Sequence, residues 1–331
     1  MLLSLTNIMF IITLIMGMAI SVTSSSWFTA WIGLELNLLS FIPLIAIGNN
    51  QYSSEAALKY FLIQALGSSL IIFLTPTLMM TGDHIHSIMV IPLLLKLGAA
   101  PFHFWFPQIM EGLYWPQAII LMTIQKIAPM FLISYIVSSQ PSFVIIIIVS
   151  ILSVLFGSIM GLNQTSLRKI MAFSSINHMG WMLMTILVSD TLMLLYFCFY
   201  TLISSSVVFI FNQQQSYYYN QLMNTNISSN IKLAMSISLL SLGGLPPFSG
   251  FVPKWMVIQE LSHMNLLIPL GFMLLATLLT LYFYLRVSVS FLTLSSPKIM
   301  SSLVSWKKEN IWVPLIIFFN FIGLMFPSMV I

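Results

Sequence analysis

The stretch Lys96-Leu-Gly-Ala-Ala-Pro-Phe-His-Phe-Trp-Phe-Pro107 places a lysine, a glycine and two prolines inside an apolar segment long enough to cross a bilayer. Pro101 has no backbone N–H and deprives the carbonyl of Leu97 of its usual helical partner, so a helix break is expected at Gly98 to Pro101. A lysine near the bilayer centre costs roughly 2.5–3.5 kcal/mol on insertion scales. A lysine beside a broken helix is typical of an ion path.

A second stretch, Leu242-Gly-Gly-Leu-Pro-Pro-Phe-Ser-Gly-Phe-Val-Pro-Lys254, has a similar pattern. The sequence aligns Leu97-Gly98 with Leu242-Gly243 and Pro101 with Pro246. One inserted residue then aligns Phe102 with Phe248 and Pro107 with Pro253. Two Gly/Pro-interrupted apolar segments at corresponding places in two halves predict a transporter built from repeats. The predicted break residues of the second stretch are Gly243, Gly244, Pro246, Pro247 and Pro253.

The composition is that of a membrane protein. Of the 331 residues 59% are hydrophobic and 5% are charged, and the mean hydropathy is +1.02. Soluble domains carry roughly 25% charged residues, so a water-soluble globule is excluded. The one cysteine, Cys198, excludes an intrachain disulfide and any iron–sulfur cluster or zinc site ligated by cysteines. The sequence has no Walker loop, dinucleotide glycine fingerprint or nucleophile elbow.

Runs of about 20 apolar residues predict an all-α protein with about eleven transmembrane spans in one domain, 1–331. The segment 231–259 is too long for one straight span, and its Gly-Gly-Leu-Pro-Pro centre predicts two half-helices. The amino terminus has no charged region and no cleavage site, so the first apolar run is expected to be a retained span. The predicted spans lie near 3–22, 27–47, 56–80, 87–106, 117–138, 142–160, 168–188, 191–211, 231–259, 266–290 and 311–330.

Lys and Arg in the loops predict the orientation, because positive loops stay on the inner side. The loops after odd-numbered spans contain Asp83, Asp190 or Glu260 and mostly lack Lys and Arg. The amino terminus is therefore expected on the positive side and the carboxyl terminus on the other. The loops after even-numbered spans contain Arg168, Lys169, Lys232, Lys298, Lys307 and Lys308.

Four charged residues remain well inside predicted spans: Glu35, Lys96, Lys126 and Lys254. Each lysine lies near a proline that is predicted to break its helix, and Pro129 is the one beside Lys126. A proline frees a backbone carbonyl or admits a water, and either can solvate an ammonium group. One acid and several bases in an apolar interior can pass protons, with Glu35 expected close enough to Lys96 to keep it charged. The alternative is that the four charges only pair and lock helices together, and Lys254 could also snorkel to an interface.

Other polar residues are weaker candidates. His178, in a polar patch of the seventh span, could extend the proton path or could be a satisfied core histidine. His103 is expected in an aromatic belt. Glu55 and Lys59 have the i,i+4 spacing of a local ion pair. No metal site is predicted, because the His84-x-His86 pair alone is weak support for one.

Six motifs resemble the antiporter-like membrane subunits of respiratory NADH:ubiquinone oxidoreductase, complex I. The resemblance covers about residues 20 to 290. The methionine and asparagine content resembles that of an arthropod chain encoded in mitochondria. The motifs are Gly33-Leu-Glu-Leu-Asn-Leu-Leu-Ser-Phe-Ile-Pro43, Lys96-Leu-Gly-x-x-Pro-Phe-His-Phe-Trp105, Gln125-Lys-Ile-Ala-Pro129, Gly161-Leu-Asn-Gln-Thr-Ser-Leu-Arg-Lys169, Ser174-Ser-Ile-Asn-His-Met-Gly-Trp181 and Leu239-Leu-Ser-Leu-Gly-Gly-Leu-Pro-Pro247.

The resemblance implies an antiporter-like fold with two inverted five-helix repeats, about 3–138 and 142–290, and a carboxyl-terminal helix at about 311–330. Eleven spans match the animal form, which lacks the first three of fourteen helices. In the resemblance Glu35 is the acidic partner and Lys96 its lysine. Lys126 is then the central lysine and Lys254 the terminal one.

The resemblance also implies a setting. The subunit would lie in the mitochondrial inner membrane, with its amino terminus in the matrix and its carboxyl terminus in the intermembrane space. Its partners would be other membrane-arm subunits, including neighbouring antiporter-like ones, accessory subunits and lipids, in a hetero-oligomer without nucleic acid. No cofactor is expected on this chain, because flavin, iron–sulfur clusters and ubiquinone would lie on other subunits.

The expected function is that of a non-redox subunit that translocates protons as electrons pass from NADH to ubiquinone. Two alternatives stay open. One is a subunit of a multi-subunit cation/proton antiporter, which has the same fold and the same buried Glu and Lys. The other is a structural or assembly subunit whose charges no longer conduct.

Overall fold

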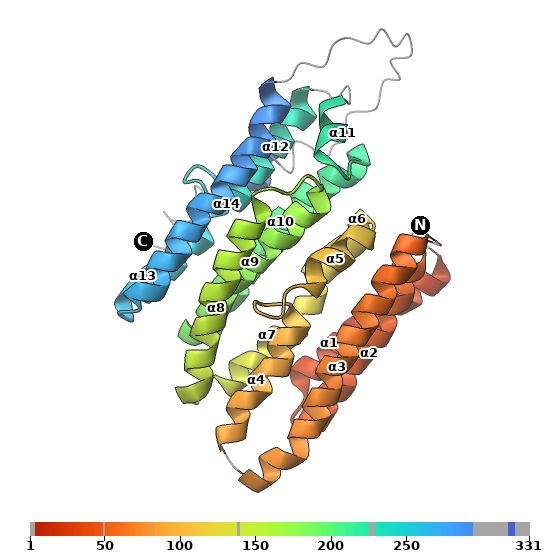
Figure 1. The fold of residues 1–331 in the computed structure, drawn as a ribbon, viewed down its shortest axis with the longest axis vertical. Helices are drawn as coiled ribbons and strands as arrows, with labels where there is room; N and C mark the ends of the chain where they lie inside the picture. Colours follow the sequence, from red (N-terminus) through yellow and green to blue (C-terminus); the bar gives the residue numbers. More distant parts are fainter. Residues whose placement is uncertain are drawn as a thin grey trace.

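The computed structural model describes residues 4–48, 50–81, 83–137, 140–224, 229–293 and 317–321. Within these ranges the regular structure is helical, apart from an isolated bridge between Ser166 and Tyr218. The helices lie side by side in Figure 1, with α1 to α3 at one edge of the molecule and α12 to α14 at the other. The prediction of an all-α protein is confirmed.

Eight segments of the described chain are long and apolar enough to cross a membrane. Each consists mostly of aliphatic and aromatic residues, so a helix that satisfies its own backbone is the stable form in lipid. The eight are α1 (Leu5–Thr23), α2 (Trp27–Ala46), α3 (Gln51–Thr81), the pair α6 (Trp115–Met122) and α7 (Ile124–Ile136), α8 (Gln140–Gly161), α9 (Leu167–Val188), α10 (Asp190–Gln214) and α14 (Leu267–Thr293).

Two further spans are broken, as predicted. The first consists of α4 (Asp83–Leu97) and α5 (Trp105–Gly112), and the second of α12 (Ser229–Gly243) and α13 (Phe251–His263). A short helix, α11 (Tyr219–Asn224), lies in the loop before α12. The eleventh predicted span, at about 311–330, lies mostly outside the described residues; its part 317–321 is helical.

The first half-helix of each broken span, α4 or α12, ends in the same way as the other. Gly98 (φ 70°) and Gly244 (φ 78°) have left-handed backbones, which glycine adopts at little cost. In each case the following N–H reaches back five residues, from Ala99 to the Leu94 carbonyl and from Leu245 to the Leu240 carbonyl. The breaks 98–104 and 244–250 therefore correspond without an insertion. The predicted equivalence of Gly98 with Gly243, and of Pro101 with Pro246, is off by one residue.

Two of the predicted helix-break prolines do not break a helix. Pro129 lies inside α7, which continues through it, and the interruption is six residues earlier, at Thr123. Pro253 lies in the first turn of α13, where backbone N–H groups have no helical partner to lose. Pro253 therefore starts the second half-helix instead of ending the first. Pro101, Pro246 and Pro247 do lie in the non-helical breaks.

An offset of 140 residues relates the first three helices of the two halves. Gly17 lets α1 approach α2 so closely that a Cβ there would lie 2.9 Å from the backbone nitrogen of Asn37. Gly157 does the same between α8 and α9, where a Cβ would lie 2.7 Å from the nitrogen of Asn177. The last helix of each half, α7 or α14, also packs on its first, α1 or α8. These parallels agree with two repeats, whereas the inversion between them stays a prediction.

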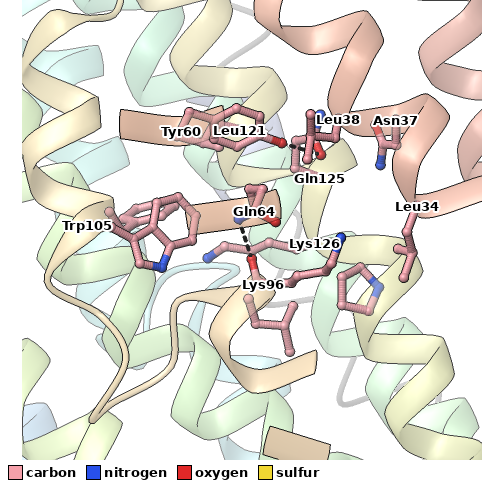
Figure 2. A pocket seen from close by; sticks show the side chains of 13 residues that line it. Leu34, Asn37, Leu38, Tyr60, Gln64, Lys96, Trp105, Leu121, Gln125 and Lys126 are labelled. Atoms are coloured by element: carbon pink, nitrogen blue, oxygen red, sulfur yellow. Dashed lines mark hydrogen bonds between the residues drawn. The ribbon is translucent and has the colours of Figure 1, made fainter. Parts of the chain in front are cut away.

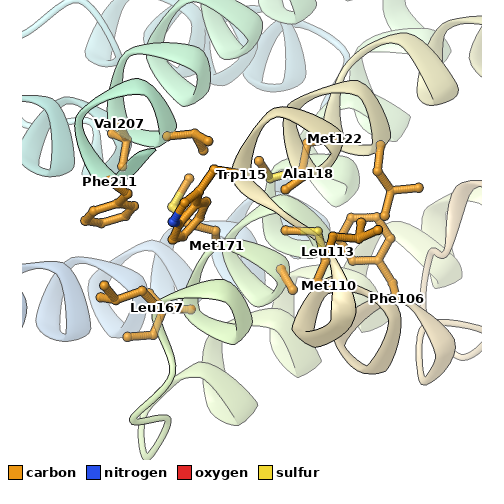
Figure 3. Packing of buried hydrophobic residues seen from close by; sticks show 14 of the residues in the cluster. Phe106, Met110, Leu113, Trp115, Ala118, Met122, Leu167, Met171, Val207 and Phe211 are labelled. Carbon is orange, nitrogen blue, oxygen red and sulfur yellow. The ribbon is translucent and has the colours of Figure 1, made fainter. Parts of the chain in front are cut away.

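Apolar packing joins the two halves. The indole of Trp115, fully buried at the start of α6, lies 5.1 Å from the ring of Phe211 on α10 and 5.9 Å from that of Tyr217. Its Nε1 donates to the carbonyl of Ser216 at 3.1 Å. Figure 3 shows the surrounding cluster, in which Met171 of α9 lies beside the indole. This core holds α5 and α6 against the second half.

Candidate functional site

A small cavity lies beside the first helix break. Its volume is about 20 Å³, enough for a water molecule, which needs roughly 10–15 Å³. Lys96 of α4 and Lys126 of α7 both line it, so the structure brings two of the predicted proton-transfer residues to one site (Figure 2). The other lining residues are Leu34, Asn37, Leu38, Tyr60, Gln64, Leu97, Trp105, Phe106, Leu121, Gln125 and Pro129.

Two hydrogen bonds from α3 frame the cavity (Figure 2). Tyr60 donates its hydroxyl to Oε1 of Gln125 at 3.1 Å, and Gln64 Nε2 donates to the carbonyl of Lys96 at 3.2 Å. Trp105 Nε1 donates to the carbonyl of Leu95 at 3.1 Å. The bonds from Gln64 and Trp105 thereby satisfy two of the carbonyls that the break exposes at the end of α4. Lys96 lies in the last turn of α4, where the helix dipole stabilises a positive charge.

Lys126 connects the two halves of the chain. Its side chain is buried, and Nζ donates to the carbonyl of Ser175 on α9 at 3.2 Å. The ammonium also lies 5.2 Å from the centre of the Phe106 ring and 5.4 Å from that of Tyr200. Two ring faces and one carbonyl can stabilise the ammonium form, and none of these three groups carries a negative charge.

His178 and Lys254 continue the line of buried basic groups. His178 lies one turn after Ser175 on α9, with its Nδ1 3.0 Å from the hydroxyl of Tyr196. Lys254 Nζ donates to the carbonyl of Gly243 at 2.8 Å and lies 3.5 Å from that of Leu242, so it caps the end of α12. The carbonyl of Leu242 also faces His178. Lys254 is 5% exposed and turns inward, so the alternative that it snorkels to an interface is wrong.

Glu35 is less closely connected than predicted. It is half-buried on α2, and its Oε2 is buried without a hydrogen-bond partner. It interacts electrostatically with Lys96 and with Tyr60, but no ion pair joins Glu35 to Lys96. The ion pairs within the described residues are Lys59 with Glu55, at 2.6 Å as predicted, and Lys169 with Glu111, at 2.7 Å.

Sequence reasoning missed the tyrosines and glutamines of the site. Tyr60, Gln64 and Tyr200 were not singled out, because one tyrosine or glutamine in an apolar span is usually a packing residue. The 140-residue offset that pairs Gly17 with Gly157 also pairs Tyr60 with Tyr200 and was the available signal. His103 was assigned wrongly. It is 1% exposed and stacks on Phe104 and Phe156 inside the protein instead of lying in an aromatic belt.

Comparison with known proteins shows the family of the chain. Residues 24–84 and 78–280 match the family model described as NADH:quinone oxidoreductase/Mrp antiporter, transmembrane. The chain is 47% identical over 339 residues to NADH-ubiquinone oxidoreductase chain 2 of Anopheles gambiae, covering 98% of each chain. It is 37% identical to the protein of the same name from Locusta migratoria, covering 93% of this chain and 88% of that one. The chain belongs to the NADH-ubiquinone oxidoreductase chain 2 family.

Solved structures show that the chain 2 fold is antiporter-like. A chain of respiratory complex I from Thermus thermophilus is similar with a TM-score of 0.84 at 21% identity, covering 98% of this chain and 79% of that one. A chain of the Mrp complex from Dietzia is similar with a TM-score of 0.73 at 16% identity, covering 86% and 59%. The fold is therefore shared by an oxidoreductase complex and an antiporter complex.

Proposed function

We propose that this chain is a non-redox core subunit of the membrane arm of respiratory complex I. It takes part in proton translocation, coupled to electron transfer from NADH to ubiquinone. The observation that carries the proposal is the buried basic line Lys96, Lys126, His178 and Lys254, which extends from one helix break to the other. The relatives are named as chains of NADH-ubiquinone oxidoreductase, and this supports the assignment of the chain to complex I.

The energetic argument concerns buried charge. The four charges inside predicted spans are those of Glu35 and the three lysines. Without compensation at the bilayer centre they would cost on the order of 10 kcal/mol by insertion values. That is comparable with the net stability of a domain. A purely structural subunit could avoid this cost with apolar residues, since replacing buried charges by well-packed hydrophobic residues is often neutral or stabilising. Two helix breaks and four buried cationic or titratable groups therefore support a conducting role.

Each group has a distinct role in the proposal. Glu35 acts on Lys96 from a distance and biases whether that lysine keeps its proton. Lys96 and Lys126 exchange a proton through the cavity that both line. Lys126 and His178 then pass it into the second half, and Lys254 is the terminal group at the second break.

The setting is part of the proposal. The chain would lie in the mitochondrial inner membrane, with Arg168 and Lys169 on the matrix side, the amino terminus in the matrix and the carboxyl terminus in the intermembrane space. Neighbouring antiporter-like subunits, accessory subunits and lipids would surround it. Flavin, iron–sulfur clusters and ubiquinone would be bound by other subunits, so this chain itself would carry out no redox step.

The replacement Lys126→Met tests the proposal in the assembled complex in sealed inner-membrane vesicles. It keeps the bulk and removes the proton site. NADH oxidation by an artificial acceptor should survive, whereas quinone-linked turnover and proton pumping should fall. Lys59→Met is the matched control, because Lys59 is 42% exposed and makes only a local ion pair. Wild-type pumping per electron and wild-type turnover in Lys126→Met would make Lys126 structural and refute the proposal.

A further inference from the structure

One side chain, Tyr200, contacts both Lys126 and His178. Tyr200 lies on α10 one turn after Tyr196. Its ring centre is 5.4 Å from Lys126 Nζ and 5.2 Å from the centre of the His178 ring. Among the hydrogen bonds and ring contacts of the described residues, no other side chain joins the two groups.

The other groups that contact the Lys126 ammonium cannot pass a proton toward His178. The carbonyl of Ser175 accepts a hydrogen bond from Nζ but carries no exchangeable proton, and the ring of Phe106 has no polar atom. A phenol hydroxyl is both donor and acceptor, so it can take up one proton while it releases another. Chemistry therefore distinguishes Tyr200 from the other groups around the ammonium.

The Tyr200 hydroxyl is in a state that suits this role. The residue is 3% exposed, and its hydroxyl is buried with no partner at standard hydrogen-bond geometry, facing the side chain of Ser175. A buried hydroxyl held only by this loose contact with Ser175 costs free energy, so a bound water or a functional need has to account for it. By contrast Tyr60, its counterpart at the 140-residue offset, has its hydroxyl fixed on Gln125 at 3.1 Å.

We propose that Tyr200 carries the proton between Lys126 and His178. The Lys126 ammonium gives a proton to the Tyr200 oxygen, directly or across one water, as the hydroxyl proton leaves toward the unprotonated nitrogen of His178. One O–H bond forms as another breaks, and Tyr200 is neutral before and after. Lys126 ends neutral and His178 ends as imidazolium. The inference rests on the proposed function, because it adds a residue to that proton path.

The test is Tyr200→Phe in the assembled complex, which keeps both ring contacts and removes only the hydroxyl. Quinone-linked turnover should fall about a hundredfold, the low end of the range that a positioned acid–base group contributes. The solvent deuterium isotope effect on turnover should rise, because proton transfer becomes limiting; a packing defect would not raise it. Tyr135→Phe is the matched control, since Tyr135 is 57% exposed, lies nine residues after Lys126 on α7 and donates its hydroxyl to the Val22 carbonyl.

Rates are measured on complex isolated at full size and divided by its NADH–ferricyanide activity, so that only assembled complexes count even if Tyr200→Phe assembles poorly. Tyr200→His, which restores a donor and an acceptor, should recover part of the turnover. Wild-type turnover and isotope effect in Tyr200→Phe, with Lys126→Met defective, would overturn the role of Tyr200 and leave the proposed function standing. Wild-type values in both variants would overturn both. A Tyr200→His variant no better than Tyr200→Phe would also overturn the relay.

Discussion

Lys126, from the first half of the chain, donates its Nζ proton to the carbonyl of Ser175 in the second half at 3.2 Å. The 140-residue offset pairs Ser175 with Glu35. The two halves therefore differ at this position, because the first half has a carboxylate side chain that can change its charge, whereas the second has a serine, whose hydroxyl and backbone carbonyl stay neutral. A change in the charge of Glu35 would alter the protonation of Lys96, whereas the Ser175 carbonyl that holds Lys126 has no charge to change.

The second helix break depends on a glycine. Gly244 has φ 78°, and a Cβ there would lie 2.8 Å from Cδ of Lys254 and 3.0 Å from its Nζ. Gly244→Ala should cost about 1–2 kcal/mol of backbone strain and displace Lys254. We expect a lower dissociation temperature of the complex on native gels and lower quinone-linked turnover.

The neighbouring glycine is the matched control for this prediction. Gly243 is helical, and a Cβ there would lie 3.6 Å from the Tyr284 ring, an ordinary contact. Gly243→Ala should therefore leave both quantities near wild type. Equal effects of the two substitutions would contradict the assignment of the left-handed position to Gly244.

Close packing of α8 on α9 gives a second prediction. A Cβ at Gly180 would collide with Val154 and lie 2.7 Å from the Ser150 carbonyl, so Gly180→Ala should destabilise the subunit by about 1–3 kcal/mol. A Cβ at Gly271 of α14 would meet nothing within 4 Å, and Gly271→Ala is the control. The measurement is again the dissociation temperature, and a loss equal to that of Gly271→Ala would show that α8 can move away.

The topology can be tested at the two ends of α9. Asn163 and Asp190 are exposed residues that flank this buried helix, so the loop charges predict Asn163 on the matrix side and Asp190 in the intermembrane space. In a Cys198→Ser background, Asn163→Cys should react with an impermeant maleimide only in inside-out vesicles, and Asp190→Cys only in right-side-out ones. Labelling of both from the same side would exclude a membrane-spanning α9.

Within the described residues the sequence predicted the spans and both breaks well, because Gly and Pro inside an apolar run change the backbone in ways that neighbours rarely override. It could not determine which glycine of Gly243-Gly244 takes the left-handed conformation, since either can. It also predicted a helix break at Pro129 that the structure does not have. A proline affects only the carbonyl and N–H nearest to it, and α7 accommodates this one while the chain breaks at Thr123 instead.

The site was predicted for its charges and missed for its neutral groups. A charge in an apolar span is costly wherever it points, so Lys96, Lys126 and Lys254 could be identified from the sequence alone. A tyrosine is costly only when its hydroxyl lacks a partner, and that depends on the helices packed around it. Tyr60 and Tyr200 lie on α3 and α10 and face lysines from other helices, so contacts distant in sequence decide their roles.

The last prediction concerns Glu35. Its Oε2 is buried without a hydrogen-bond partner, and it acts on Lys96 without an ion pair. Glu35→Gln keeps the shape and removes the charge, so quinone-linked turnover should fall while NADH–ferricyanide activity persists. Glu55→Gln removes an equally negative charge from an exposed local ion pair and should have little effect.

A double-mutant cycle then asks whether Glu35 acts through Lys96. If it does, Glu35→Gln combined with Lys96→Met should be no worse than Lys96→Met alone, because the acid has lost the group on which it acts. Additive losses would show that Glu35 acts on another group, and Tyr60, its other electrostatic neighbour, would be the next to test.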